Sequence, residues 1–136
     1  MSDTAAAKKT ADTLAVGQQL VDLCRQGKFK EATDKLYSPD IVSIEAQGSP
    51  SMPARMEGIK AVKGKGEWWE QNHEVHGAEV DGPWPQGDRF IVRFKLDVTA
   101  KSGPMAGKRM TLDEAGLYTV KNGKIAQEEF FYHMGG

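Results

Sequence analysis

Three glutamates are the residues of this sequence best suited to chemistry, and they are Glu45, Glu114 and Glu129. Their carboxyl groups are expected to meet on one face of a sheet, where packed core gives way to a pocket. Burial and mutual repulsion of carboxylates favour the neutral acid and raise its pKa, which suits general acid or base catalysis near neutral pH. The alternative is that one or more of them lies at a solvated rim or in a structural network and does no chemistry.

The grouping of two of these acids rests on the sequence Lys121-Asn122-Gly123-Lys124. Asn-Gly is the strongest short-range signal for a two-residue hairpin turn, because both turn positions need a positive φ. With Lys121 opposite Lys124, one side of the hairpin pairs Val120 with Ile125, Tyr118 with Gln127, Gly116 with Glu129, Glu114 with Phe131, and Leu112 with His133. The other side pairs Leu117 with Glu128, Ala115 with Phe130, and Asp113 with Tyr132. The first side passes from apolar core to carboxylates, as the wall of a pocket does.

Further side chains are expected to line the same pocket, and they are Trp69, His73, Phe94, Tyr118, Gln127, Phe131 and His133. Several have a structural explanation as well: Trp69 fits the buried stripe of a helix, and Tyr118 could simply pack beside its neighbour. His73 and His76 could share one helix face, although structural or rim histidines are commoner than functional ones. Without a His-Glu-x-x-His motif or a Cys/His cluster, the sequence predicts no metal site and no cofactor.

The composition argues against several classes of function. The 136 residues carry 18 basic and 19 acidic side chains, for a formal net charge of −1, so no strong field for nucleic acid or an anionic membrane is expected. The single cysteine, Cys24, cannot form an intramolecular disulfide and fits a reducing compartment. No apolar segment resembles a signal peptide or reaches the roughly 20 residues of a transmembrane helix. The sequence therefore predicts a cytoplasmic protein without nucleic-acid or membrane partners.

The elements that would position these residues follow from hydrophobic periodicity and from glycine and proline. Residues 1–9 lack apolar periodicity and are expected to form a disordered tail before a single domain over 10–136. The predicted elements are helices over 10–26, 28–37 and 58–76, strands over 41–45 and 88–99, a strand that starts at 79–81 and ends in 82–85, and a closing hairpin over 107–134. The clearest strand has one apolar face, formed by Phe90, Val92, Phe94, Leu96 and Val98. Helices followed by a meander of strands predict an α+β fold, with the helices covering that apolar face.

Three parts of the sequence resemble one known family. They are Leu36-Tyr37-Ser38-Pro39-Asp40-Ile41-Val42-Ser43-Ile44-Glu45, the Gly-Ile-Lys-containing third helix with Trp68-Trp69, and Asn122-Gly123-Lys124-Ile125 followed by Glu129-Phe130-Phe131-Tyr132. After two N-terminal helices, they resemble the SnoaL-like members of the nuclear transport factor 2-like superfamily over about residues 10–134. The resemblance implies a cone-shaped α+β fold, with a curved antiparallel or mixed sheet wrapped around three helices and a pocket at the open end. It also implies a homodimer formed through the sheet.

The family includes ketosteroid isomerases, polyketide cyclases, dehydratases and binding domains without catalysis, so fold does not decide function. By resemblance to the isomerases, Glu45 takes the position of their proton-abstracting carboxylate. Glu114 similarly takes the position of the neutral acid that donates a hydrogen bond to the developing oxyanion. Leu20 stands where the isomerases have an oxyanion tyrosine. An isomerase mechanism would therefore lack half of its oxyanion hole, which argues against steroid isomerisation itself.

The sequence leaves three functions open. The first is binding of a small hydrophobic, carbonyl-containing molecule, with isomerisation, cyclisation or dehydration in which Glu45 is the base and Glu114 or Glu129 the proton donor. The second is a non-catalytic ligand-binding or protein-interaction module, in which the same acids only orient a ligand. The third is a fold whose pocket is filled by its own side chains, among them Met52 and Met56.

Overall fold

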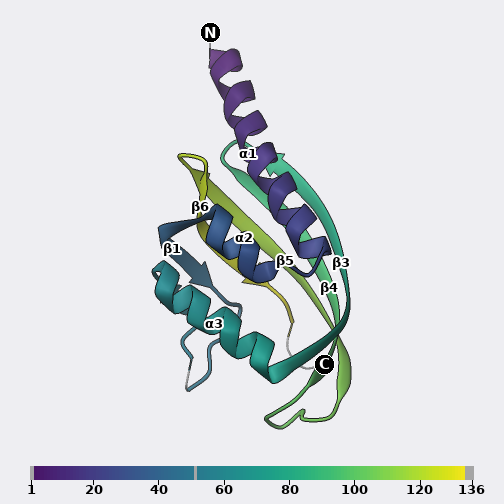
Figure 1. The fold of residues 1–136 in the computed structure, drawn as a ribbon. Helices are drawn as coiled ribbons and strands as arrows, with labels where there is room; N and C mark the ends of the chain where they lie inside the picture. The colour runs from purple at the N-terminus through teal and green to yellow at the C-terminus, as the bar shows by residue number, and fades with distance from the viewer. Residues whose placement is uncertain (1, 51, 134–136) are drawn as a thin grey trace.

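The structure, a computed structural model, describes residues 2–50 and 52–133 of the chain (Figure 1). Its elements are α1 (Ser2–Arg25), α2 (Phe29–Leu36), β1 (Tyr37–Ile44), β2 (Arg55–Glu57), α3 (Ile59–Asn72), β3 (His73–Gln86), β4 (Arg89–Ala100), β5 (Arg109–Lys121) and β6 (Lys124–Phe131). The strands form one sheet in the order β2-β1-β6-β5-β4-β3. Neighbouring strands are antiparallel except β1 and β6, which are parallel.

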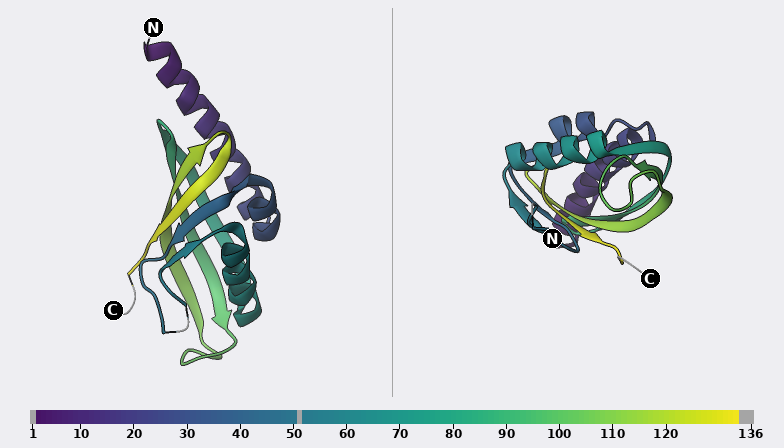
Figure 2. Two further views of the ribbon diagram at one scale, coloured as in Figure 1. Left: turned by 90° about the vertical axis from the view of Figure 1, so that its left-hand side faces the viewer. Right: turned by 90° about the horizontal axis from the view of Figure 1, so that it is seen from below.

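The sheet is strongly curved, and the helices lie on its inner face (Figure 2). Seen from below, the sheet bends around α1 while α2 and α3 lie across the open side of the curve. This arrangement confirms the predicted cone-shaped α+β fold with a mixed sheet. The polar side chains of the site described below come from β1, α3, β5 and β6, which share this inner side.

The core lies between the helices and the inner face of β4. The alternation predicted for this strand is confirmed: Phe90, Val92, Phe94, Leu96 and Val98 are each at most 6% exposed. The residues that α1 buries against the sheet include Val16, Leu20, Val21 and Cys24. Burial of these apolar side chains, at about 25 cal/mol per Å², holds the helix against the sheet. Leu20 is therefore a core residue that offers no hydrogen-bond donor.

The first helix begins at Ser2, well before the predicted beginning near Thr10, so residues 2–9 are helical. The segment carries three consecutive alanines, over 5–7, and alanine has the highest helix propensity of all residues. In Figures 1 and 2 this end of α1 projects past the edge of the sheet. Apolar periodicity reports burial rather than helix formation, and so it missed these turns, in which residues 5 and 7–9 are exposed.

The third helix ends at Asn72 rather than at the predicted His76, and His73 begins β3. The prediction that His73 and His76 share a helix face is therefore wrong. β3 also begins well before the predicted strand, which starts at 79–81 and ends in 82–85, because it pairs with β4 from His73 opposite Ala100 to Gln86 opposite Arg89. Most of its side chains are exposed or half-buried, so the alternation that reveals a strand is missing from its sequence.

The closing hairpin has the predicted turn but not the predicted register. Asn122 and Gly123 have φ values of 51° and 77°, and Lys121 lies opposite Lys124. Val120 pairs with Ile125 but Thr119 pairs with Gln127, so Ala126 is a bulge without a partner. A one-residue slip moves every later side chain to the other face. Beyond Ala126 the predicted pairs are therefore wrong, and Tyr118 lies opposite Glu128, Gly116 opposite Phe130, and Ala115 opposite Phe131.

Among the described residues, no helix is both long enough and apolar enough to cross a membrane.

Candidate functional site

Glu128 is the buried acid at the centre of the inner polar cluster. The residue is 3% exposed and lies opposite Tyr118 on β6. The Tyr37 hydroxyl donates a hydrogen bond to its Oε1, and the Ser43 hydroxyl donates to its Oε2 at 2.7 Å. Burial raises the pKa of Glu128 above its usual range, and the two hydroxyl donors and a nearby lysine oppose that rise.

The nearby lysine is Lys65, which extends from α3 into the cluster with only 13% of its side chain exposed. Its Nζ donates to Ser43 Oγ at 2.6 Å and lies 2.7 Å from Glu45 Oε1. It also lies 5.5 Å from the centroid of the Phe130 ring, within the range of a cation–π contact. Because the Ser43 hydroxyl has one hydrogen and gives it to Glu128, its oxygen is free to accept from Lys65.

Glu45 follows directly after β1, as the sequence predicted for the end of this strand, and 24% of its side chain is exposed. Both of its carboxylate oxygens are occupied. Oε1 forms the ion pair with Lys65, and Oε2 accepts a hydrogen bond of 3.1 Å from the Tyr132 hydroxyl. The chain of contacts therefore runs without interruption from Tyr132 through Glu45, Lys65 and Ser43 to Glu128.

Glu114 is the exception among these acids. It lies on β5 opposite Phe94 and is half-buried on the inner side. Within residues 2–50 and 52–133, its carboxyl group has no hydrogen bond or ion pair. Burial raises its pKa to about 7, with repulsion from Glu45 and Glu128 as further causes and attraction to Lys65 as the opposing one. Glu114 therefore has a carboxyl group that can gain or lose a proton near neutral pH.

Three aromatic side chains, here called the aromatic floor, lie beside Glu114: Phe90, Tyr118 and Phe130. The Tyr118 ring stacks on Phe90 with centroids 4.9 Å apart and meets the Phe130 ring edge-on at 6.2 Å. It also lies over Gly116, where a Cβ atom would come within 2.8 Å of Tyr118 Cε2 and 3.1 Å of its hydroxyl oxygen. Because Gly116 and Glu114 are neighbours on the inner side of β5, the hydroxyl end of Tyr118 is directed toward the acid.

The other predicted pocket residues divide between two places. Trp69 and His73 are half-buried at the junction of α3 and β3, where their rings stack at 4.5 Å and His73 Nδ1 hydrogen-bonds the Trp69 carbonyl oxygen at 2.8 Å. Phe94 is a core residue, 5% exposed, and it lies opposite Glu114. Phe94 therefore lies on the same inner side as the acids, and Trp69 and His73 lie where α3 meets β3. A role in ligand binding for them remains a prediction.

The slipped register places the remaining predicted residues elsewhere. Gln127 lies opposite Thr119 and Glu129 opposite Leu117, so both are on the outer face of the sheet. Phe131 is on that face too and is 52% exposed, while His133 is exposed beyond the end of β6. The structure therefore brings together Glu45 and Glu114 as predicted but replaces Glu129 with Glu128.

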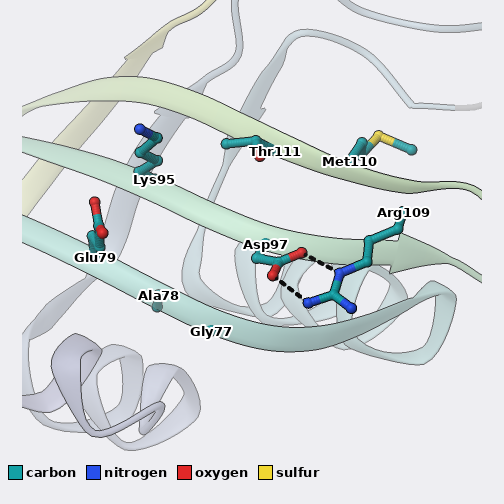
Figure 3. Close-up of a pocket in the computed structure, with 8 residues that line it drawn as sticks. All are labelled: Gly77, Ala78, Glu79, Lys95, Asp97, Arg109, Met110 and Thr111. Carbon is teal, nitrogen blue, oxygen red and sulfur yellow. Dashed lines mark hydrogen bonds and ion pairs between the residues drawn. The ribbon is translucent and has the colours of Figure 1, made fainter.

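Two hollows on the described surface are each lined by residues other than the inner acids. The larger, of about 510 Å³, is open and lies over β3, β4 and β5 on the outer face of the sheet (Figure 3). Its polar side chains include Asp97 and Arg109, which form two hydrogen bonds of 2.7 and 2.9 Å. The smaller, of about 410 Å³, lies between α1 and the Gly82-Pro83 segment of β3.

Sequence reasoning missed several residues of the inner cluster, and they are Tyr37, Ser43, Lys65, Glu128, Phe130 and Tyr132. For Lys65 a signal existed, because Val62, Lys65 and Trp69 are spaced three and four apart and share one helix face. Ser43 likewise shares the buried face of β1 with Ile41, two residues before it. For Glu128 there was no signal, since its position depends on the bulge at Ala126.

Residues 11–132 match the model of the SnoaL-like domain family. A crystal structure from Mesorhizobium loti, of a protein provisionally named a SnoaL-like polyketide cyclase, is 46% identical over 87% of this chain and 97% of that chain, with a TM-score of 0.80. No curated protein matches the chain.

More distant structures share the fold alone. A Pseudomonas putida protein, provisionally named a polyketide cyclase, is 17% identical with a TM-score of 0.69 over 90% of this chain and 92% of that one. A Catenulispora acidiphila protein with a ketosteroid isomerase-like fold, crystallised with trimethylamine, is 14% identical with a TM-score of 0.67 over 88% and 85%. With the family model covering nearly the whole described chain, the protein belongs to the SnoaL-like domain family and has its ketosteroid isomerase-like fold.

Proposed function

We propose that the protein binds a small, largely apolar, carbonyl-containing molecule on the inner side of the sheet beside Glu114. We further propose that Glu114 moves a proton on this molecule in an isomerisation, cyclisation or dehydration. One observation carries the proposal: the half-buried Glu114 carboxyl group has no partner in the described part of the chain, and its pKa is raised to about 7. A group with such a pKa exchanges protons with a weak carbon acid most effectively near neutral pH.

Glu114 is better suited to this role than Glu45, which the sequence favoured as the base. Both oxygens of Glu45 are engaged, by Lys65 at 2.7 Å and by the Tyr132 hydroxyl at 3.1 Å. A proton arriving on Glu45 would have to disrupt one of these contacts, whereas Glu114 has none to lose. We assign Glu45 a supporting role, in which it holds Lys65 and Tyr132 in place.

The surroundings of Glu114 favour an apolar ligand. Phe94 lies opposite it on β4, and Phe130 lies opposite Gly116, the next inward residue on β5. Aromatic surfaces of this kind bind the body of a ligand, while a few polar groups orient it. The 46% identical relative from Mesorhizobium loti is named a SnoaL-like polyketide cyclase, with carbohydrate phosphatase in brackets, and the first part of this name fits a carbonyl-rich polyketide ligand.

The second candidate is a binding module without catalysis. The hydrogen bonds among Glu45, Lys65, Ser43 and Glu128 favour it, because a connected network of this kind resembles a rigid scaffold as much as an active site. Under this alternative Glu114 accepts or donates one hydrogen bond to a ligand and transfers no proton. The two candidates share the ligand site and differ in turnover alone.

The experiment that separates them is exchange of α-hydrogens for deuterium on a panel of cyclic and aromatic ketones, followed by NMR. Catalysis predicts that the protein accelerates exchange on some members and that Glu114→Gln abolishes it while ligand affinity stays within about threefold. The matched control is Asp113→Asn, because Asp113 is adjacent on β5 but faces outward in an exposed ion pair with Arg93. Ligand binding without accelerated exchange would select the binding module. No binding by any ketone would contradict both candidates.

We also propose that two copies of the chain associate through the outer face of the sheet. Exposed aromatic and aliphatic side chains gather there: Trp84 is 54% exposed, Ile91 44% and Phe131 52%. Trp84 pairs with Ile91 and Ile91 pairs with Leu117, so they form a row across β3, β4 and β5. A contiguous apolar patch of this kind on the surface of a domain often marks an interface.

A further inference from the structure

Lys65 is held in a way that leaves part of its ammonium group available. A lysine ammonium has three N–H donors and no acceptor. Two of them are used, by Ser43 Oγ at 2.6 Å and Glu45 Oε1 at 2.7 Å. The Phe130 ring lies 5.5 Å from Nζ, and no further hydrogen bond of Nζ occurs among the described residues. The third N–H therefore has no hydrogen-bond partner in the described part of the chain, and the Phe130 ring is the aromatic group beside it.

The position of this ammonium is fixed by groups behind it. Lysine side chains are normally mobile, with four rotatable bonds and a strongly hydrated charge. Here the Ser43 hydroxyl donates its one hydrogen to Glu128, so the Ser43 oxygen accepts the hydrogen bond from Lys65. Tyr37 holds the other oxygen of Glu128, so the carboxylate cannot turn away. A chain of contacts from the core thus orients one charged donor.

Lys65 and Glu114 lie on either side of Phe130. Gly116 pairs with Phe130, and Glu114 is the next inward residue along β5, so Glu114 and Phe130 are diagonal neighbours. The Cα atoms of such neighbours are about 7–8 Å apart. Lys65 lies over the same ring from the direction of α3. A planar ligand resting on Phe130 would have a cation near one end and a carboxyl group near the other.

We propose that the Lys65 ammonium stabilises the negative charge that develops on a ligand carbonyl oxygen while Glu114 moves the proton, and that Ser43 and Glu128 position it for this. The inference rests on the proposed function, since it needs a carbonyl ligand beside Glu114. Preorganised donors aimed at a developing oxyanion contribute strongly to catalysis, because they need no reorganisation when the charge appears.

The step balances within the ligand and Glu114. The Glu114 carboxylate takes a proton from the carbon next to the carbonyl, and the electron pair of that C–H bond forms the C=C bond of an enolate. The carbonyl π pair moves onto oxygen, where the third Lys65 N–H donates a hydrogen bond. Glu114 then returns the proton to a carbon of the enolate, so an isomerisation consumes no other reactant.

The simpler role for Lys65 is structural, as a bridge that neutralises Glu45. Both roles predict that Lys65→Met disturbs the site, so stability alone does not separate them. Loss of a structural lysine changes the affinity for all ligands alike. Loss of an oxyanion donor lowers the affinity selectively for ligands with an anionic oxygen. The useful quantity is the ratio of affinities for two probes of one shape, para-nitrophenolate and neutral para-nitroanisole.

The test is a titration of both probes by absorbance and calorimetry against the wild-type protein, Lys65→Met, Lys65→Arg and Lys63→Met. Lys63 is the matched control, because it lies on the same helix but forms an exposed ion pair with Asp34. We expect Lys65→Met to lower the phenolate-to-anisole affinity ratio by about tenfold or more, the value of a hydrogen bond to a charged group. Lys63→Met should leave the ratio unchanged, and Lys65→Arg should retain most of it.

The outcomes are distinguishable. Equal losses for both probes in Lys65→Met, or no loss for either, would overturn the role of Lys65 while leaving the proposed ligand site intact. Failure of the wild-type protein to bind para-nitroanisole at all would overturn the ligand site and the role of Lys65 together. If Lys65→Met does not fold, the same ratio measured for Ser43→Ala decides. This variant removes one of the two groups that hold the ammonium, so the ratio should fall, and an unchanged ratio would overturn the positioning.

Discussion

Tyr118 lies directly opposite Glu128 across β5 and β6, although the turn at Asn122 and Gly123 would place Gln127 there. The single unpaired residue Ala126 causes the difference. It turns Glu128 into the core, where Tyr37 and Ser43 donate to it, and turns Glu129 to the outer face. The composition of the inner site therefore depends on one bulge.

Replacing the two neighbouring glutamates separately tests this register. We expect Glu128→Ala to destabilise the protein by about 2–4 kcal/mol, because it leaves the Tyr37 hydroxyl and the buried Ser43 hydroxyl without their acceptor. Glu129→Ala should change the free energy of unfolding by about 1 kcal/mol or less. Urea denaturation followed by circular dichroism measures both. Equal effects, or a larger one for Glu129→Ala, would mean that Glu128 is not the inward acid.

A second substitution tests the aromatic floor. Gly116→Ala would place a Cβ atom 2.8 Å from Tyr118 Cε2, inside any normal contact distance. Because the Tyr118 ring is held between Phe90 and Phe130, we expect overpacking to destabilise the fold by about 1–3 kcal/mol. Gly77→Ala on β3 is the control, since a Cβ atom added there would meet no other atom within 4 Å. The two melting temperatures give the comparison, and a stabilised Gly116→Ala protein would show that the ring lies elsewhere.

The dependence of stability on pH tests the raised pKa of the Glu114 carboxyl group. Its pKa is raised from about 4.5 to about 7 in the folded protein, so between these values the folded state binds more protons than the unfolded state. Stability from this group is therefore complete below about pH 4.5 and is lost as the pH rises through about 7. We expect the melting temperature of Glu114→Gln to fall less than that of the wild-type protein over this window. Parallel curves for the two proteins would count against a buried, titrating Glu114.

Association through the outer face of the sheet is tested by Ile91→Glu. Ile91 is 44% exposed in the apolar row with Trp84, and a buried charge there would oppose pairing of two copies. We expect the wild-type mass in solution to be that of a dimer and the Ile91→Glu mass that of a monomer, by light scattering. The control is Met105→Glu, because Met105 lies in a loop and is also 44% exposed, and this variant should remain dimeric. A monomeric wild-type protein would rule out the interface.

Much of the fold could be predicted because its signals are local. The Asn122-Gly123 turn, the apolar face from Phe90 to Val98 and the end of the first helix at Arg25 each follow from a few neighbouring residues. β3 was largely missed because an edge strand with exposed side chains has no hydrophobic alternation. The extra turns at the beginning of α1 were missed because their sequence has no apolar periodicity.

The site was harder to predict because it joins distant segments. Lys65 and Ser43 are 22 residues apart, and Ser43 and Glu128 are 85 apart, so their contact depends on the parallel pairing of β1 with β6. Glu114 could be found, since it lies on a regular strand with a predictable inward face. Glu129 was chosen in place of Glu128 because no residue near Ala126 signals the bulge.

The most direct measurement is the NMR titration of the Glu114 carboxyl carbon in the unliganded protein, assigned by comparison with Glu114→Gln. The proposed function requires this group to exchange its proton near neutral pH. We expect its midpoint at about 7, as burial and the nearby Glu45 and Glu128 carboxylates dictate. A midpoint near the ordinary glutamate value of about 4.3 would show a solvated carboxylate and would contradict the role of Glu114 as the acid–base group.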